Sequence, residues 1–365
     1  MDTQKGSPNM VVTDGHHPRY RQRFLYGALY GNIYARLADG ISACVDDVNS
    51  KKEHPHPGYL CDAQRAVYQE MFRLWMLEYT AGESLDELAS NLTKIVDEFV
   101  RWNELNVAYR LFLQKEFKDH GDTDLTVCAV DFDNQTEYEN ALQLLGVAIM
   151  VRDGRSIKRI IAAMASNRRQ DALYEQLIFD YVNDPLEDIE DVLHEKPYAT
   201  LLDAYFQEDK ETAALSVQSY LKQWYRYQDG ARWYDGHKKI QEDESFYYGY
   251  WAFEAGATCY LLDIDDSTID HMVYPKDLVA YGRKLREENR VTSDFDIPLG
   301  LDGYPLSRLR CEAGQPCPQA GWWLTPAKVN SRRHFTSGEI MPAFEGSSYG
   351  STIWQWDIDQ SAPNT

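Results

Sequence analysis

Residues 84–99 read Ser-Leu-Asp-Glu-Leu-Ala-Ser-Asn-Leu-Thr-Lys-Ile-Val-Asp-Glu-Phe, and this stretch decides the fold class. Ser84 and Glu87 have the spacing of a capping box, in which each side chain bonds a backbone amide at a helix start. The apolar residues that follow recur at helical spacing, and they are Leu85, Leu88, Leu92, Ile95, Val96 and Phe99. The stretch predicts an amphipathic helix.

The same pattern continues toward the N-terminus of the chain. Apolar residues at three- and four-residue spacing occupy one helix face, and they are Tyr26, Leu29, Tyr30, Ile33, Tyr34 and Leu37. Pro55 and Pro57 interrupt the pattern, because proline lacks a backbone donor and restricts the residue before it. We expect helix again over residues 63–79.

Further helix signals follow a looser stretch at residues 118–136. Thr136 with Glu139 resembles a capping box before the apolar run 141–151. Asp184, Pro185 and Glu187 have the residue types of another helix start. Short connections and the lack of a fixed repeat predict a mostly α protein, built as an antiparallel helical array or bundle.

The composition changes beyond about Arg290. Glycine and proline become frequent, and short aromatic or β-branched runs such as 322–324 and 352–356 predict a small C-terminal β-rich module. A few short strands bury little surface, so we expect this module to pack on the helical body. The predicted division is a disordered tail (1–20), an N-terminal helical domain (21–130), a central helical domain (131–290) and the β-rich module (291–365).

The chain is strongly acidic, with 37 Lys and Arg against 58 Asp and Glu and a formal charge of −21. Such a charge repels nucleic acids and anionic membranes and attracts a basic protein. It also serves solubility, and charge alone does not separate the two roles. No run of eighteen apolar residues occurs, and residues 1–17 lack the features of an export signal, so we expect a cytoplasmic protein without a membrane partner.

The acidic excess is concentrated. Residues 180–211 hold eleven carboxylates against two lysines, whereas a solvated helix face usually mixes both signs. A second acidic group lies at residues 242–244. We therefore interpret ten carboxylates as a candidate binding face for a basic partner, and they are Asp184, Glu187, Asp188, Glu190, Asp191, Glu208, Asp209, Glu242, Asp243 and Glu244.

Glu254 admits a different chemistry. It lies close to the helical face formed by Trp251, Ala255, Thr258 and Leu262. A carboxyl group among aromatic residues can be a general acid of a glycan-acting hydrolase, which requires a second carboxylate about 5–10 Å away. It can equally be a buried acceptor of structural hydrogen bonds, which is the interpretation we favour.

Other catalytic or metal-binding patterns are incomplete. Cys311 and Cys317 lack the second half of a zinc site, and His237 fits a structural role. The sequence contains no phosphate-binding glycine loop and no Ser nucleophile elbow. We therefore predict no metal, no cofactor and no enzymatic activity, and a helical scaffold protein remains a further alternative.

Two sets of motifs resemble known families. Residues 220–225, 233–237, 248–255, 265–267 and 274–278 resemble the C-terminal domain of the PoNi-like immunity proteins. Residues 317–354, with Gly321-Trp322-Trp323 and Met341-Pro342, look like a terminal module of immunity proteins linked to type VI secretion. Because such aromatic and acidic motif positions are usually packing residues, we assign a structural role to Trp251, Glu254, Asp277, Trp322, Trp323 and Trp354.

The resemblance covers roughly residues 141–356 and does not extend clearly over 1–133. It implies a helical, non-catalytic immunity protein that binds a cognate secreted toxin, expected to be a nuclease, delivered by a neighbouring cell. An acidic face would then imitate the phosphate track that a basic nuclease recognises. Neither the resemblance nor the residues fix the contact residues, the oligomeric state or the role of residues 1–130.

Overall fold

The computed structural model describes residues 20–117, 129–182, 185, 189, 191–231, 233–238, 246–292, 310–325, 327–328, 331–344, 352–357 and 360. Within these ranges it contains ten α-helices and one four-stranded antiparallel sheet between residues 310 and 356. The predicted mostly α fold with a small β-rich element near the C-terminus is confirmed. None of the helices in these ranges is both long and apolar enough to cross a membrane.

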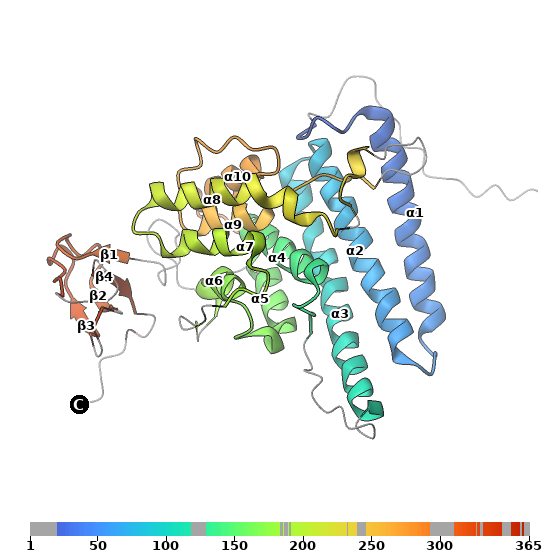
Figure 1. Cartoon of the computed structure of the whole chain (residues 1–365), viewed down its shortest axis with the longest axis horizontal. Helices are drawn as coiled ribbons and strands as arrows, with labels where there is room; N and C mark the ends of the chain where they lie inside the picture. Colours follow the sequence, from blue (N-terminus) through green and yellow to red (C-terminus); the bar gives the residue numbers. More distant parts are fainter. Residues whose placement is uncertain are drawn as a thin grey trace, which may run out of the picture.

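Three long helices lie side by side at one end of the helical body (Figure 1). They are α1 (Gly27–Lys51), α2 (Pro57–Ala81) and α3 (Leu85–Phe117). The helix predicted from residues 84–99 is therefore confirmed, with its start at Leu85. Helix α2 begins earlier than the predicted residue 63, because Pro57 fits the first turn and the His56 ring accepts a hydrogen bond from the Gly58 amide.

Helix α4 (Gln135–Met150) runs through the centre of the body, and residues 141–150 are all buried. Its cap is Asn134, whose side chain accepts from the Thr136 and Glu137 amides, so the predicted capping box of Thr136 and Glu139 is wrong. The cap sits two residues earlier, and Glu139 is consequently placed inside the helix. Helix α4 packs closely on α9 (Phe253–Leu261), since a Cβ on Gly146 would lie 2.9 Å from the Phe253 carbonyl oxygen.

The remaining helices complete the body around α4 and α9. They are α5 (Gly154–Ala163), α6 (Ala172–Ile178), α7 (Glu195–Leu202), α8 (Lys210–Trp224) and α10 (Lys276–Glu287). Short 3-10 turns join them, and they are η2 (Ala165–Asn167), η3 (Phe179–Tyr181), η4 (Asp203–Phe206), η5 (Tyr225–Gln228) and η6 (Gly236–Lys238).

The helix start predicted around Pro185 is wrong. Pro185 and Ile189 are not helical, and the next helix, α7, begins only at Glu195. Farther along the same connection, the backbone is tied to the start of α6: the Asp191 carbonyl accepts from the Ala172 amide at 2.8 Å, and the Leu193 amide donates to Asp171 at 3.1 Å. These bonds use backbone groups that a helix would have needed for itself.

The two predicted helical domains contribute to one hydrophobic core, which extends from Leu25 to Val279. Gln22 ties the first described residues into that core. Its amide nitrogen donates to the carbonyls of Tyr250 and Met272, and its amide oxygen accepts from the Tyr247 hydroxyl and the Tyr250 amide. Residues near the start of the chain are thus anchored on the segment that leads into α9. The boundary near residue 130 stays a prediction.

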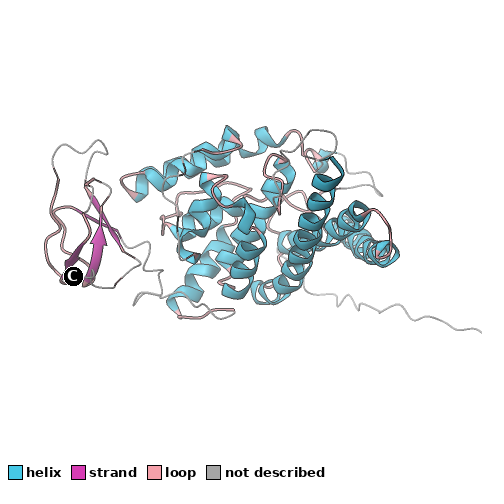
Figure 2. Ribbon diagram, turned by 90° about the horizontal axis from the view of Figure 1, so that it is seen from below, coloured by secondary structure: helices cyan, strands magenta, loops and turns pink. Residues whose placement is uncertain are grey.

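The sheet lies at the other end of the molecule from α1 (Figures 1 and 2). Its strands are β1 (Arg310–Glu312), β2 (Gly321–Leu324), β3 (Arg333–Phe335) and β4 (Ile353–Trp356), in the order β1-β4-β2-β3. They enclose a second, separate core that includes Trp323, Phe335 and Trp354. The Arg310 guanidinium reaches the Tyr205 carbonyl of η4 at 3.4 Å. Packing of the whole module on the body remains a prediction.

Candidate functional site

The structure describes three of the ten proposed acidic contact residues. Asp191, Glu208 and Asp209 are all exposed, as a contact surface requires. The other seven lie outside the described residues, and they are Asp184, Glu187, Asp188, Glu190, Glu242, Asp243 and Glu244. Their role in binding therefore stays a prediction from the sequence.

Glu208 and Asp209 lie with two further carboxylates in residues 203–211, which we call the α7–α8 turn. Asp203, Glu208, Asp209 and Glu211 are all exposed there. Asp209 caps α8, because its carboxylate accepts from the Thr212 amide at 2.7 Å and from the Thr212 hydroxyl at 3.0 Å. These two hydrogen bonds lower the pKa of Asp209, so the cap stays ionised at neutral pH.

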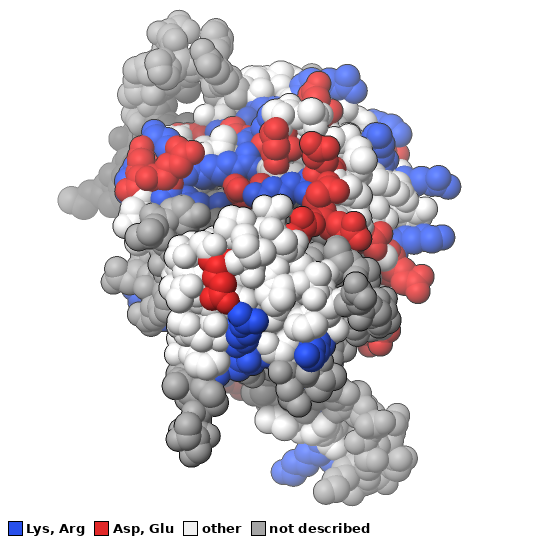
Figure 3. Space-filling view, turned by 90° about the vertical axis from the view of Figure 1, so that its left-hand side faces the viewer, with Lys and Arg blue, Asp and Glu red and all other residues white. Residues whose placement is uncertain are grey.

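The cation within this turn is already paired. The Lys210 ammonium lies 2.7 Å from the Asp263 carboxylate. Figure 3 shows this end of the molecule, where Asp and Glu side chains gather above the sheet module with Lys and Arg among them. The face in this view thus mixes both signs, and residues 203–211 themselves hold four carboxylates against one lysine.

Glu254 is a fully buried hydrogen-bond acceptor. One carboxylate oxygen accepts from the Tyr220 hydroxyl at 2.5 Å and from the Trp224 indole at 3.1 Å. The other oxygen has no hydrogen-bond partner among the described residues. Burial raises the pKa of Glu254 to about 7, although the Tyr220 hydrogen bond opposes the shift.

Glu139 of α4 is the second carboxylate beside Glu254. It is also buried and accepts from the Gln143 amide at 3.0 Å. Burial, and then the Glu254 carboxylate, raise the pKa of Glu139 well above its ordinary value. Glu139, Gln143, Trp224 and Trp251 are among the residues that line a cavity of about 10 Å³. Roughly one water molecule fits such a space, and a sugar ring does not.

This arrangement favours the structural interpretation of Glu254. A glycoside hydrolase needs two carboxylates on either side of a bound sugar. Glu139 and Glu254 instead lie in the core, where hydroxyl, indole and amide donors hold them. Among the described residues, the contacts of Glu254 are those of a buried structural acceptor.

Two further motif residues, Trp251 before α9 and Asp277 in α10, join this part of the chain to α2. The Trp251 indole donates to the Thr80 hydroxyl at 2.8 Å, and its ring meets the Tyr79 ring edge-on at 4.7 Å. Asp277, at the start of α10, accepts from the Tyr79 hydroxyl and forms an ion pair with Arg21. Trp251 is buried and Asp277 is partly exposed. Through these contacts both residues connect elements of the fold.

The motif tryptophans of the sheet differ in exposure. Trp323 and Trp354 are fully buried in the module core, as a packing role requires. Trp322 points to the opposite face and is half-buried. The Arg332 guanidinium lies 4.4 Å from its ring centroid, and the His334 ring meets it edge-on at 5.5 Å.

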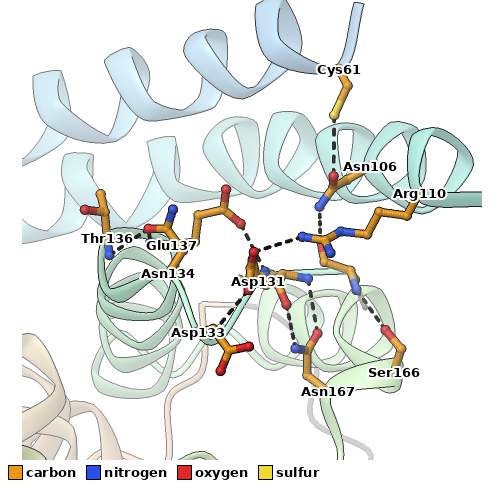
Figure 4. A network of polar contacts seen from close by, with 12 residues as sticks. Cys61, Asn106, Arg110, Asp131, Asp133, Asn134, Thr136, Glu137, Ser166 and Asn167 are labelled. Atoms are coloured by element: carbon orange, nitrogen blue, oxygen red, sulfur yellow. Dashed lines mark hydrogen bonds and ion pairs between the residues drawn. The ribbon is translucent and has the colours of Figure 1, made fainter. Parts of the chain in front are cut away.

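A second polar cluster surrounds residues 129–137 (Figure 4). Asp131 forms an ion pair with Arg110 of α3 at 3.2 Å, and its amide donates to Glu137 at 3.0 Å. Asn106 and Asn167 bond the backbone of Ala129 and Val130 from two sides. The cluster holds the chain where it enters α4, so we assign it a structural role.

The candidate metal-binding and histidine residues that the structure describes have contacts of other kinds. No group of three or more His, Cys, Asp or Glu side chains in the described part of the chain is arranged to hold a metal ion. His237 stacks on Phe24 at 4.3 Å, and its Nδ1 lies 2.7 Å from the Tyr250 hydroxyl. These contacts are those expected of a structural histidine. Cys311 and Cys317 are free thiols in the core of the sheet module.

Sequence reasoning missed two exposed apolar residues, Phe206 in the α7–α8 turn and Leu215 in the part of α8 that follows it. Their side chains are 59% and 62% exposed. Helical spacing could have found Leu215, because it follows the exposed Glu211 by four residues and so lies on the same face of α8. Glu139 was missed because only the packing of α4 on α9 brings it to Glu254.

Comparisons with known proteins bear on the fold and on residues 169–278. The crystal structure of protein PA2201 from Pseudomonas aeruginosa matches with a TM-score of 0.54 and 19% identity, over 72% of this chain and 90% of that chain. At that identity the match shows a shared fold alone. No curated protein matches the chain. Residues 169–278, which include the buried Glu254 network, match the family described as PoNe immunity proteins (PoNi), C-terminal, so this segment is similar to that family.

Proposed function

We propose that this protein is an immunity protein that binds and neutralises a cognate, basic nuclease toxin. The match of residues 169–278 to the C-terminal region of the PoNe immunity proteins carries the proposal. The activity is binding without catalysis, and the partner is a toxin delivered by a type VI or related secretion system. Cytoplasmic localisation follows from the proposed role, since the toxin acts inside the cell.

Electrostatics supports a basic partner. The chain has a formal charge of −21, and the described part of the α7–α8 turn places four exposed carboxylates together. Complementary charge raises the association rate and makes it sensitive to salt. Lasting protection also requires slow dissociation, at a Kd of about 1 nM or below. The ten proposed acidic residues would supply the fast encounter.

The test of function is protection of living cells. Bacteria that produce the toxin encoded beside this gene should survive when this protein is produced with it. A variant with buried Trp224 changed to Asp, which disrupts the core, controls for the effect of expression itself. Equal killing with and without the intact protein would show that it confers no immunity to that toxin.

The test of the acidic face is a charge reversal. Changing Glu187, Asp188, Glu190 and Asp191 to lysine should slow association at least about tenfold at low salt and flatten its salt dependence. The control variant carries the same change in net charge on exposed residues at the other end of the body, and these are Asp39, Asp46, Asp47 and Glu53. Equal effects of both variants would mean that total charge matters and this face does not.

A further inference from the structure

The exposure of Phe206 is built into the fold. In η4 the neighbouring Ala204 and Tyr205 are 2% and 1% exposed, and the Tyr205 hydroxyl lies 3.1 Å from the Thr258 hydroxyl in the core. With Tyr205 fixed inward, Phe206 is directed to solvent. No ring or cation among the described residues covers it, whereas the exposed Phe246 carries the Arg36 guanidinium 4.9 Å from its ring centroid.

Leu215 is likewise held outward by its helix. Ala214, Val217 and Leu221 of α8 face the core, and Leu215 lies on the opposite side with Glu211 one turn before it. It lies about 8 Å along the helix from Lys210, at a rise of about 1.5 Å per residue. Phe206 and Leu215 are nine residues apart in the sequence, and nine residues of chain span at most about 30 Å, so one partner of ordinary interface size can contact both.

The surroundings of both residues are anionic. Asp203, Glu208, Asp209 and Glu211 are exposed, and Asp263 already pairs with Lys210. Apolar anchors within a polar rim are the usual composition of an interface hot spot. A second copy of this chain is disfavoured as the occupant, because its own charge of −21 would be repelled. A partner with lysine and arginine around an apolar recess fits both features.

We propose that Phe206 and Leu215 are the apolar anchors by which the α7–α8 turn and the adjoining part of α8 hold the basic toxin. This inference rests on the proposed function and deepens it. The carboxylates around the turn accelerate the encounter, and the Phe206 ring and the Leu215 side chain, once covered by the toxin, slow dissociation.

The experiment measures binding of the purified toxin domain encoded beside the gene, by surface-based kinetics at two salt concentrations. Phe206→Ala and Leu215→Ala should each weaken binding about tenfold, mainly through faster dissociation and equally at both salt concentrations. Glu208→Gln with Glu211→Gln should instead slow association, and only at low salt. Phe246→Ala and Ile340→Ala, which remove side chains of similar exposure elsewhere, should change binding less than about twofold.

The outcomes separate this inference from the proposed function. Unchanged dissociation of both anchor variants, with tight binding by the intact protein, would overturn the anchors and leave the immunity role standing. Failure of the intact protein to bind would overturn both for that toxin. Thermal unfolding of each variant checks that the fold is retained, and Phe206→Ser and Leu215→Ser repeat the test with polar side chains.

Discussion

Buried carboxyl groups are the most unusual residues of this protein. Glu139 and Glu254 lie in the core, and burial raises the pKa of both. A carboxyl group that holds its proton more tightly in the folded state stabilises that state at low pH and loses this contribution as the pH rises. For Glu254 the window runs from its ordinary pKa of 4.5 to about 7.

Glu254→Gln tests this at the residue scale. In the intact protein the free energy of unfolding should fall between pH 4.5 and 7, with about 3 kcal/mol of that fall due to Glu254. The variant keeps an acceptor for Tyr220 and Trp224 but cannot ionise, so its profile should be flatter. Urea unfolding at several pH values measures the difference. The exposed Glu208→Gln is the control, and equal slopes in all three proteins would contradict the assignment.

At the scale of elements, contacts far apart in the sequence join the N-terminal helices to the matched segment. Trp251 bonds Thr80, Asp277 bonds Tyr79, and Gln22 bonds the segment before α9. Each contact joins a residue before 81 to a residue after 246. The matched segment therefore owes part of its stability to residues outside the match.

Gln22→Ala measures that dependence. Loss of the amide leaves buried groups of Tyr247 and Tyr250 and the partly buried carbonyl of Met272 without their partner, so unfolding should become easier by about 3 kcal/mol. Gln218→Ala is the matched control, since its amide makes one exposed hydrogen bond to Thr268 and should contribute less than about 0.5 kcal/mol. Chemical denaturation compares the two. A cost for Gln22→Ala no greater than for the control would contradict the proposed anchoring.

At the scale of the whole molecule, the described residues form two hydrophobic cores. The larger core ends at Val279, and the smaller contains residues from Cys311 to Trp356. Surface burial in a module of four short strands is small, so its stability should depend on the helical body, whereas the body should not depend on the module.

Separate production of residues 1–292 and 293–365 tests this asymmetry. The longer piece should unfold cooperatively within about 5 °C of the complete chain, since the larger core stays intact. The shorter piece should show no cooperative transition by near-ultraviolet circular dichroism. A stable isolated module would contradict the predicted dependence on the body, and a collapse of the longer piece would contradict the division at residue 290.

Patterns within one element were sufficient to predict the fold class. The spacing of Leu85, Leu88 and Leu92 predicted α3, and the run 141–151 predicted α4, because helical periodicity is a local property of the chain. Two predicted helix starts were wrong. Bonds from the start of α6 engage the backbone of residues 191–193, next to the segment around Pro185 where a helix start was predicted, and Asn134 rather than Thr136 caps α4.

The sequence alone therefore determined the helical class, the acidic character and the family resemblance of this protein. Only the tertiary structure brought Glu139 to Glu254, buried Gln22 and left Phe206 and Leu215 in solvent. The physical reason is that helix formation depends on neighbours within about one turn, whereas burial and pairing depend on which faces of distant helices meet.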